Sequence, residues 1–312
     1  MSLLKNFGKV ITASKKEYRK KRYSDFQLFE GFGEDNLLCF GDNEDLMKYL
    51  LQKKDMAGKI QQIYIDPPFF SKATYDATIK VQNAEGDEIK IKKRAYEDIW
   101  EEGMEEYLKM MGVRLMLMKD LLSETGTIWV HLDWHGVYYV KVLMDEIFGE
   151  KNFINEIVWT YKSGGSSKSH FARKHDTILV YGKSKKYYID IPKEKSYNRD
   201  YKPYRFKGVE EFQDEVGWYT MVNMKDVWAI DMVGRTSKER NGYATQKPEA
   251  LIERIIKAGS HEGDLVADFF CGSATLAAVA ERENRHWICS DNSKVATDCA
   301  KTRLENKQLS ML

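Results

Sequence analysis

Long apolar runs, paired cysteines and an excess of one charge are all absent from this sequence, and each absence excludes a class of protein. No stretch reaches the roughly 18 consecutive apolar residues that a membrane-spanning helix requires, so we expect no membrane contact. The N-terminal residues MSLLKNFGKV contain no apolar core of a signal peptide. The 4 cysteines show neither C-x-x-C spacing nor a neighbouring histidine pair, so the sequence predicts no metal site and a reduced intracellular compartment.

A net charge of +1, from 49 Lys+Arg and 48 Asp+Glu, neither demands nor excludes a nucleic-acid partner. The charges are nevertheless segregated, because residues 160–209 contain 13 basic, 4 acidic and 9 aromatic residues, which is a net charge of +9. Such a stretch suits the neutralisation of phosphates and stacking on bases, and the alternative is a small solvated β-rich insertion. Another basic run, KKEYRKKR at 15–22, is expected to be a solvated helix or arm. The residues expected to contact DNA are Lys162, Lys168, Arg173 and Lys174.

Apolar periodicity predicts an α/β fold. Two short apolar runs, LLCFGDN and KIQQIYIDPPFF, flank EDLMKYLLQK, whose apolar spacing is helical, and this order indicates a parallel strand–helix–strand unit. The order recurs near the C-terminus, where DLVADFF and HWICSDNS flank CGSATLAAVAERE. The other expected elements are a hairpin over about 78–95 that turns at Glu85-Gly86-Asp87, helices over 104–122 and 138–149, a strand over 125–134 and the helix KPEALIERIIKAGS.

Small residues follow the apolar strand of the C-terminal unit, in the segment from Asp268 to Thr275. Small residues at a strand-to-helix turn let the backbone approach a ligand closely. The next strand ends in Asp291, 23 residues after Asp268, and an acid at this place can bind both ribose hydroxyls of a nucleotide-like cofactor. The turn lacks the full G-x-G-x-x-G pattern, which disfavours a nicotinamide oxidoreductase. Small residues that serve only the packing of helix on sheet are the alternative.

The segment Asp66-Pro67-Pro68-Phe69, at the end of an N-terminal strand, is the more specific signal. Two prolines fix φ at both positions and remove two backbone donors, so the carbonyl of Pro67 points in a set direction as an acceptor. Ionised Asp66 is a pure acceptor. Together they suit the –NH₂ group of an aromatic amine, whose nitrogen becomes more nucleophilic when both N–H groups are hydrogen-bonded, and Phe69 offers a stacking face. The alternative is a Pro-Pro turn that only caps the strand.

With these two segments the chain resembles the β-class amino-methyltransferases of DNA, which include the modification subunits of Type III restriction systems and cell-cycle adenine methyltransferases. In that family a catalytic (D/N/S)-P-P-(Y/F/W) segment precedes a target-recognition region and an F-x-G-x-G cofactor loop. The matching segments are IDPPFF at 65–70, the basic stretch, TQKPEALIERII at 245–256 and FCGSAT at 270–275. The resemblance covers most of residues 36–300 and departs at Ala274, which stands where a second glycine is usual.

The resemblance implies a role for each matched residue at the catalytic end. Asp66 and the carbonyl of Pro67 would bind the target amino group, in the turn that Pro68 completes, and Phe69 would stack on a base flipped out of double-stranded DNA.

The cofactor implied by the resemblance is S-adenosylmethionine. Asp291 would bind its ribose, Lys247 would lie near its methionine moiety and Asp42 would contact its adenine. The cofactor loop at the methionine end would comprise Asp268, Phe270, Gly272, Ser273, Ala274 and Thr275.

The implied fold is α/β, a Rossmann-like S-adenosylmethionine-dependent methyltransferase core with a mainly parallel twisted sheet and permuted motif order. Its expected parts are a basic N-terminal arm (1–30), the catalytic half of the core (31–155), an inserted basic target-recognition region (156–244) and the cofactor-binding half (245–312). We expect the protein to be cytoplasmic, or nucleoid-associated in a prokaryote.

The implied function is site-specific methylation of the exocyclic amino group of a base in DNA. N6 of adenine is favoured, because the family links Asp at the first catalytic position more often with adenine than with cytosine. N4 of cytosine, adenine in RNA and a catalytically silent nucleic-acid-binding subunit stay open as alternatives. The resemblance also leaves open a homodimer and a restriction endonuclease partner.

Overall fold

The computed structural model describes residues 3–29, 32, 33, 35–82, 88–163 and 165–311. Its helices are α1 (Leu3–Tyr18), α2 (Asn43–Lys53), α3 (Met104–Leu121), α4 (Val137–Phe148), α5 (Glu249–Gly259), α6 (Thr275–Arg282) and α7 (Lys294–Met311), with short 3-10 turns η1 (Glu150–Asn152) and η2 (Arg199–Tyr201). Its strands are β1 (Gln27–Phe29), β2 (Leu37–Phe40), β3 (Ile60–Ile65), β4 (Thr74–Gln82), β5 (Glu88–Glu97), β6 (Leu122–Leu132), β7 (Phe153–Thr160), β8 (His175–Gly182), β9 (Lys193–Tyr197), β10 (Phe212–Gln213), β11 (Trp218–Asn223), β12 (Val227–Ala229), β13 (Leu265–Asp268) and β14 (His286–Asp291). Among these residues, no helix combines the length and the apolarity needed to cross a bilayer.

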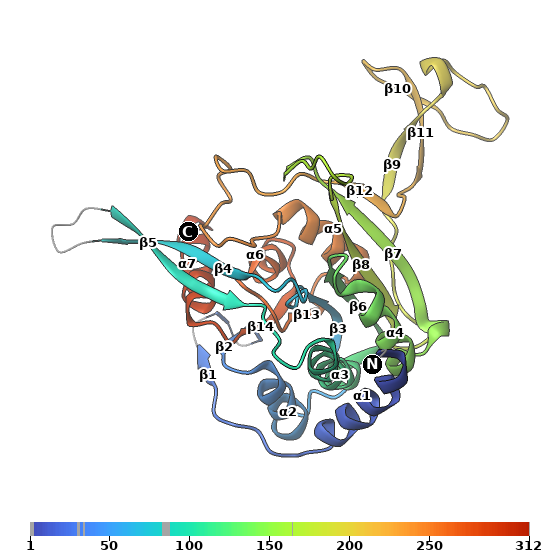
Figure 1. Cartoon of the computed structure of the whole chain (residues 1–312). Coiled ribbons are helices and arrows are strands. Elements are labelled where there is room, and N and C mark those ends of the chain that lie inside the picture. The colour runs from blue at the N-terminus through green and yellow to red at the C-terminus, as the bar shows by residue number, and fades with distance from the viewer. Residues whose placement is uncertain (1–2, 30–31, 34, 83–87, 164, 312) are drawn as a thin grey trace.

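One large sheet organises the described chain (Figure 1). Its strands lie in the order β1-β2-β14-β13-β3-β6-β8-β7-β12, and the strands from β2 to β6 in this order are all parallel. β2 and β3 are joined through α2 along the chain, yet β14 and β13 from the C-terminal region lie between them in the sheet. The two predicted strand–helix–strand units therefore share one sheet, and the expected α/β core with a mainly parallel sheet is confirmed.

Helices cover both faces of this sheet, and the burial of β3 shows the result. Ile63 and Ile65 pack with residues of α2, α3 and α4, whereas Tyr64 packs with residues of α5 and α6. This alternation follows from the period of two residues in a strand. The polar residues of β3 are buried too, and Gln62 is hydrogen-bonded through Nε2 to the carbonyl of Ile255 on α5 (2.6 Å). A central parallel strand is thus buried on both faces, and its polar side chains need protein partners.

The N-terminal helix α1 packs against α3 instead of standing in solvent. Val10 is 5% exposed, and Ser14 donates a hydrogen bond to the carbonyl of Lys109 on α3 (3.2 Å). The two helices approach closely because α3 has Gly112 at the contact, where a Cβ atom would lie 2.6 Å from Oγ of Ser14. Part of the expected N-terminal arm therefore forms a helix that packs on α3 through Val10 and Ser14, whereas Lys15, Lys16 and residues 19–22 of the basic run are exposed, as expected.

Two segments project from the core (Figure 1). The first is the antiparallel hairpin β4–β5, which is longer than the hairpin expected over about 78–95; the turn expected at Glu85-Gly86-Asp87 lies outside the described residues. The second is the small sheet β10-β11-β9, from the region expected to recognise the target. The other strands of that region, β7, β8 and β12, belong to the large sheet, so the boundary expected at 156 falls inside β7.

Candidate active site

Acidic residues stand at the ends of four neighbouring parallel strands. Asp42 follows β2, Asp291 ends β14, Asp268 ends β13 and Asp66 follows β3. The carboxyl ends of parallel strands share one edge of a sheet, and open α/β sheets bind ligands at this edge. The fold thus brings together the predicted catalytic segment and the predicted cofactor loop, which lie almost 200 residues apart in the sequence.

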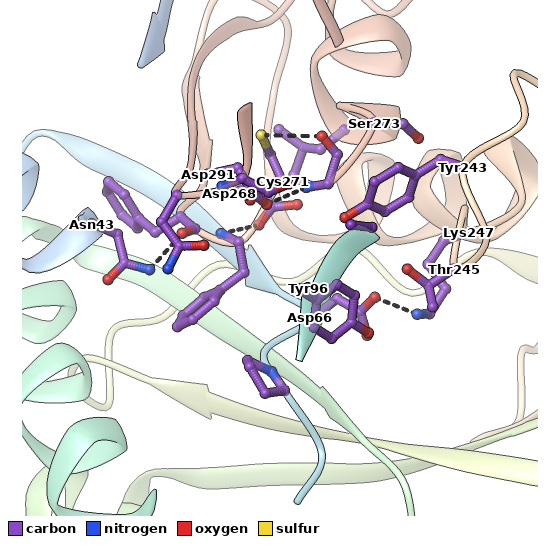
Figure 2. A pocket seen from close by; sticks show the side chains of 18 of the residues that line it. Asn43, Asp66, Tyr96, Tyr243, Thr245, Lys247, Asp268, Cys271, Ser273 and Asp291 are labelled. Carbon is purple, nitrogen blue, oxygen red and sulfur yellow. Dashed lines mark hydrogen bonds and ion pairs between the residues drawn. The ribbon is translucent and has the colours of Figure 1, made fainter. Parts of the chain in front are cut away.

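A cavity of about 560 Å³ lies at this edge (Figure 2). The sequence-predicted residues that line it are Asp42, Asp66, Pro68, Lys247, Asp268, Phe270, Gly272, Ser273, Thr275 and Asp291, whereas Pro67, Phe69 and Ala274 are not part of its wall. The sequence reasoning missed Tyr96 and Trp100 at the end of the hairpin, Arg114 on α3, and Tyr243 in the loop before α5. These residues come from segments that no motif connects.

The loop after β13 is shaped by backbone in the left-handed region. Gly272 has a φ of +51° and Ala274 a φ of +54°. Glycine adopts such angles freely, and a Cβ atom at Gly272 would also lie 3.1 Å from the ring of Tyr243. At Ala274 the same region costs on the order of 1 kcal/mol. The alanine that departs from the family pattern therefore stands in a glycine-like conformation, directly before α6.

Asp291 holds this loop from the neighbouring strand. One of its carboxylate oxygens accepts a hydrogen bond from the backbone N–H of Gly272 (2.9 Å), and the other accepts one from the N–H of Ser293 (2.8 Å). Burial raises the pKa of Asp291 to about 6, although these two hydrogen bonds oppose the rise. At pH 7 a mainly ionised acceptor therefore lines the cavity, at the strand end where the sequence predicted a ribose-binding acid.

Asp268 and Asp42 already have structural partners. Asp268 is 3% exposed and accepts a hydrogen bond from the N–H of Phe270 (2.9 Å), and burial raises its pKa well above the usual range. Asp42 caps α2 through the N–H of Glu44 (2.7 Å), and both its oxygens accept hydrogen bonds from Arg114 (2.9 Å each). Arg114, inside the Met- and Leu-rich helix α3, was the sequence signal that could have indicated this contact.

Asp66 is paired with Lys247. The ammonium group of Lys247 forms an ion pair and a hydrogen bond with Oδ2 of Asp66, and the two side chains are 12% and 17% exposed. The other oxygen, Oδ1, is buried and has no hydrogen-bond partner among the described residues. The same ammonium group lies 5.4 Å from the ring centre of Phe69. The lysine that the resemblance assigned to the methionine moiety thus lies at the predicted catalytic carboxylate (Figure 2).

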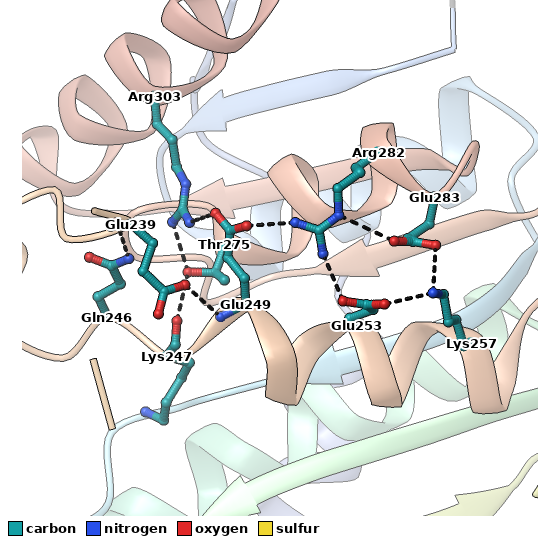
Figure 3. Close-up of polar contacts among 10 residues, drawn as sticks. All are labelled: Glu239, Gln246, Lys247, Glu249, Glu253, Lys257, Thr275, Arg282, Glu283 and Arg303. Atoms are coloured by element: carbon teal, nitrogen blue, oxygen red, sulfur yellow. Dashed lines mark hydrogen bonds and ion pairs between the residues drawn. The ribbon is translucent and has the colours of Figure 1, made fainter. Parts of the chain in front are cut away.

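The segment that carries Lys247 is anchored by a polar network (Figure 3). Glu249, at the start of α5, accepts hydrogen bonds from Arg282 (2.7 Å) and Arg303 (2.6 Å). Arg303 also donates to Oγ1 of Thr275 (2.9 Å), and Thr275 donates to the carbonyl of Lys247 (3.4 Å). The network therefore ties the backbone of Lys247 to the cofactor loop and to α7.

The ring of Phe69 rests on a buried polar network. It stacks on the imidazole of His131, at the end of β6, with ring centres 5.9 Å apart and an interplanar angle of 28°. His131 is fully buried between Oη of Tyr64 (2.9 Å) and Oδ2 of Asp176 (3.2 Å), and Oδ1 of Asp176 accepts a hydrogen bond from Tyr161 (3.1 Å). Burial would raise the pKa of Asp176, but these hydrogen bonds lower it overall. A histidine inside the apolar run TIWVHL was the sequence signal that could have indicated this network.

The basic residues expected to contact DNA lie in one loop, between β7 and β8. Residues 161–174 contain no acidic residue, whereas residues 193–223 of the projecting sheet contain 6 basic and 6 acidic residues. Lys162, Lys168 and Arg173 are exposed, and the guanidinium of Arg173 lies 4.0 Å from the ring centre of Trp134, just after β6. Lys174 donates to the carbonyl of Lys162 (3.2 Å) and so also supports the loop. The positive charge of this region is therefore concentrated beside the end of β6.

Comparison with known proteins decides the family. Residues 60–302 match the family model described as DNA methylase. The chain belongs to this DNA methylase family. It is 29% identical over 265 residues to the Type II methyltransferase M2.DpnII of Streptococcus pneumoniae, with 84% of this chain and 88% of the relative covered. It is 30% identical over 258 residues to the Type II methyltransferase M2.LlaDCHI of Lactococcus lactis subsp. cremoris, with 82% and 86% covered. The family match confirms the resemblance drawn from the motifs.

Solved structures of methyltransferases share the fold. The complex of M1.HpyAVI with SAM superposes with a TM-score of 0.54 at 17% identity and covers 86% of this chain and 98% of that one. The PvuII DNA methyltransferase, described as cytosine-N4-specific, superposes with a TM-score of 0.57 at 17% identity and covers 86% of each chain. The predicted methyltransferase core is thereby confirmed.

Proposed function

We propose that this DNA methylase transfers a methyl group from S-adenosylmethionine to the exocyclic amino group of a flipped base, N6 of adenine, at a specific DNA sequence. The observation that carries the proposal is the arrangement at the end of β3. Asp66 borders a cavity of about 560 Å³, and one of its oxygens is buried without a hydrogen-bond partner among the described residues. It is paired with the ammonium group of Lys247, which lies 5.4 Å from the ring centre of Phe69. This volume lies in the range of pockets that hold small molecules and cofactors.

The residues around the cavity suit S-adenosylmethionine. Asp291 is an acceptor for ribose hydroxyls, and Asp42 is an acceptor for the adenine amino group. The hydroxyl of Ser273 is buried and has no hydrogen-bond partner among the described residues, so it is a polar group available to the methionine end of the cofactor. When bound, S-adenosylmethionine supplies an electrophilic methyl group on a positively charged sulfur. The other residues that would shape its site are Lys247, Asp268, Phe270, Gly272, Ala274 and Thr275.

Asp66 and the carbonyl of Pro67 would accept hydrogen bonds from the two N–H groups of the target amine. Such bonds favour a tetrahedral nitrogen whose lone pair is free to attack, so they strengthen as the methyl group is transferred and lower the barrier. Alignment of the amine with the methyl group can contribute roughly 7–11 kcal/mol more. Because Lys247 occupies Oδ2 of Asp66, the amine must use Oδ1 or displace the ammonium group.

A base reaches Asp66 only after it leaves the helical stack, at a cost of a few kcal/mol. We propose that it then stacks on Phe69, whose ring His131 holds in place. The phosphates near the flipped base would meet the basic loop 161–174, where Trp134 and Arg173 offer a further stacking surface. The Type II relatives support a role in a restriction–modification system. A homodimer and an endonuclease partner stay predictions from the resemblance.

Single-molecule sequencing of DNA from cells that express the protein tests this proposal. We expect N6-methyladenine in one sequence context with the wild-type protein and none with Asp66→Ala. The exposed acid Asp298 on α7 offers a matched control, because Asp298→Ala removes a carboxylate that does not line the cavity and should leave methylation unchanged. Modified cytosine in place of adenine would correct the base. Unmodified DNA in cells that contain folded wild-type protein would contradict the proposed activity.

A further inference from the structure

The loop that carries Phe69 is held by a carboxylate that no motif indicated. Asp98 follows β5 and is 1% exposed. Its Oδ2 accepts hydrogen bonds from the backbone N–H of Phe69 (3.0 Å) and from both the N–H (2.6 Å) and the hydroxyl (2.7 Å) of Ser71. Its Oδ1 accepts hydrogen bonds from the N–H of Phe70 (3.1 Å) and from the indole of Trp100 (2.9 Å). One buried carboxylate therefore receives every hydrogen bond that these three consecutive N–H groups are seen to make.

Three consecutive N–H groups converge on one anion only when the backbone between them turns in an uncommon way. Here Phe70 has a φ of +66° and Lys72 a φ of +59°, both in the left-handed region that non-glycine residues avoid. Such strain persists where the surroundings over-determine the conformation. The carboxylate of Asp98 supplies that constraint, because its two oxygens together accept hydrogen bonds from the N–H groups of Phe69, Phe70 and Ser71.

Asp98 also joins the catalytic loop to the root of the hairpin β4–β5. Its backbone N–H donates to the carbonyl of Ala73 (2.9 Å), and its carbonyl accepts from the N–H of Lys72 (3.1 Å). Tyr96, two residues earlier, lines the cavity together with Thr245, which lies two residues before Lys247. The residue thus stands between the loop that carries Phe69 and the wall of the cavity.

We propose that Asp98 is the positioning residue of the catalytic loop. It is not part of the cavity wall, and it acts through Phe69. The N–H of Phe69 and the carbonyl of Pro68 share one rigid peptide plane, so the hydrogen bond to Asp98 orients that plane. The ring of Phe69 is stacked on His131, so both its backbone and its side chain are held in place before a base arrives. This inference rests on the proposed function, because the position of Phe69 matters for the rate only if Phe69 receives the target base.

The isosteric variant Asp98→Asn tests the role. Its amide nitrogen replaces one acceptor oxygen by a donor, so at least two of the N–H and O–H groups around it lose their partner. We expect the rate constant of single-turnover methyl transfer to fall by about tenfold or more. A modest distortion of the loop is enough for this loss, because the rate depends steeply on the placement of the reacting groups. The signal of 2-aminopurine at the target position should show a weakly retained base. The dissociation constant of S-adenosylmethionine should change by less than about threefold, which separates positioning from a general loss of structure.

The rate constant is the relevant quantity, because misfolded protein lowers the amplitude of a single turnover and leaves its rate constant unchanged. Asp76→Asn is the matched control, since Asp76 is exposed on β4 of the same hairpin and the substitution makes the same chemical change. It should retain the wild-type rate constant. A wild-type rate constant in Asp98→Asn would overturn the proposal.

Hydrogen exchange in the wild-type protein provides a second test of the role of Asp98, which requires neither enzymatic activity nor a variant. The amides of residues 69–71 lie outside helices and strands, yet we expect them to exchange as slowly as those of β3, because Asp98 holds them. Rapid exchange of these amides would overturn the proposal even if Asp98→Asn failed to fold. A wild-type protein that methylates no DNA but protects these amides would contradict the proposed function and leave the role of Asp98 in the loop intact.

Discussion

Replacement of Asp291 by asparagine should change stability and cofactor binding in opposite directions at neutral pH. Burial raises the pKa of this carboxyl from its ordinary value of 3.8 to about 6. The folded state therefore holds the proton more tightly than the unfolded state. The resulting stabilisation is fully present below pH 3.8 and is lost as the pH rises through about 6, so ionisation of Asp291 at pH 7 weakens the apoprotein.

The difference between these two pKa values sets the magnitude. Ionisation of Asp291 lowers the free energy of unfolding of the wild-type protein by about 1.6 kcal/mol at about pH 5 and by about 3 kcal/mol at about pH 8. Asparagine does not ionise, so this pH-dependent loss is absent from the variant. Its side chain can accept a hydrogen bond from only one of the N–H groups of Gly272 and Ser293, which lowers its free energy of unfolding by about 1–2 kcal/mol at every pH. Relative to wild type, the free energy of unfolding of Asp291→Asn should therefore rise by about 1.4 kcal/mol between about pH 5 and about pH 8. This slope is independent of the lost hydrogen bond.

Urea unfolding of both proteins across this pH range measures the slope. Asp298→Asn is the control, because Asp298 is exposed on α7 and its side chain is 51% accessible. It should show no comparable slope. S-adenosylmethionine should raise the melting temperature of the wild-type protein but not that of Asp291→Asn, and NAD should stabilise neither. A flat difference would refute the burial of an ionised Asp291, and an unchanged cofactor response in the variant would refute the ribose contact.

Further expectations concern the base, the cofactor loop and the DNA. Phe69→Ala should weaken retention of the flipped base by about 1–3 kcal/mol in a 2-aminopurine assay, whereas Phe69→Tyr should retain it, and equal losses would refute stacking. Gly272→Ala places a Cβ atom 3.1 Å from Tyr243 at a φ of +51°. Calorimetry should therefore show about tenfold weaker binding of S-adenosylmethionine, and an unchanged affinity would mean that the loop adapts. The logarithm of DNA affinity should fall linearly with the logarithm of salt concentration, at a slope of about −0.9 per phosphate contacted. Joint alanine replacement of the basic residues in the loop 161–174 should flatten this slope, and an unchanged slope would mean that the DNA binds elsewhere. The residues replaced are Lys162, Lys168, Arg173 and Lys174.

The chemistry proposed for the segment Asp66 to Phe69 could be predicted from the sequence because it depends on residue type and on immediate neighbours. Proline restricts φ wherever it stands, and an aspartate is an acceptor in any fold, so Asp66 to Phe69 indicated an amine site without a structure. The strands and helices were predictable for the same reason, since apolar periodicity is a local property of the chain. The sequence therefore predicted both the α/β methyltransferase core and the order in which its motifs follow one another along the chain.

Tertiary structure decided which segments meet. β13 and β14 lie between β2 and β3, and this arrangement brings Asp291 to the cavity that Asp66 borders. Lys247 pairs with Asp66, and His131 lies beneath Phe69. No period or spacing along the chain encodes such contacts, because the order of strands depends on which apolar faces of the whole chain bury one another.

The backbone conformation of individual residues was also decided by the fold. The sign of φ at Ala274 was open in the sequence, since alanine allows a left-handed turn at a small cost and does not demand one. Asp98 had no visible role, because its partners in the catalytic loop approach it only after the hairpin β4–β5 has returned to its root. A buried carboxylate takes its function from the donors around it, and those donors are assembled by folding.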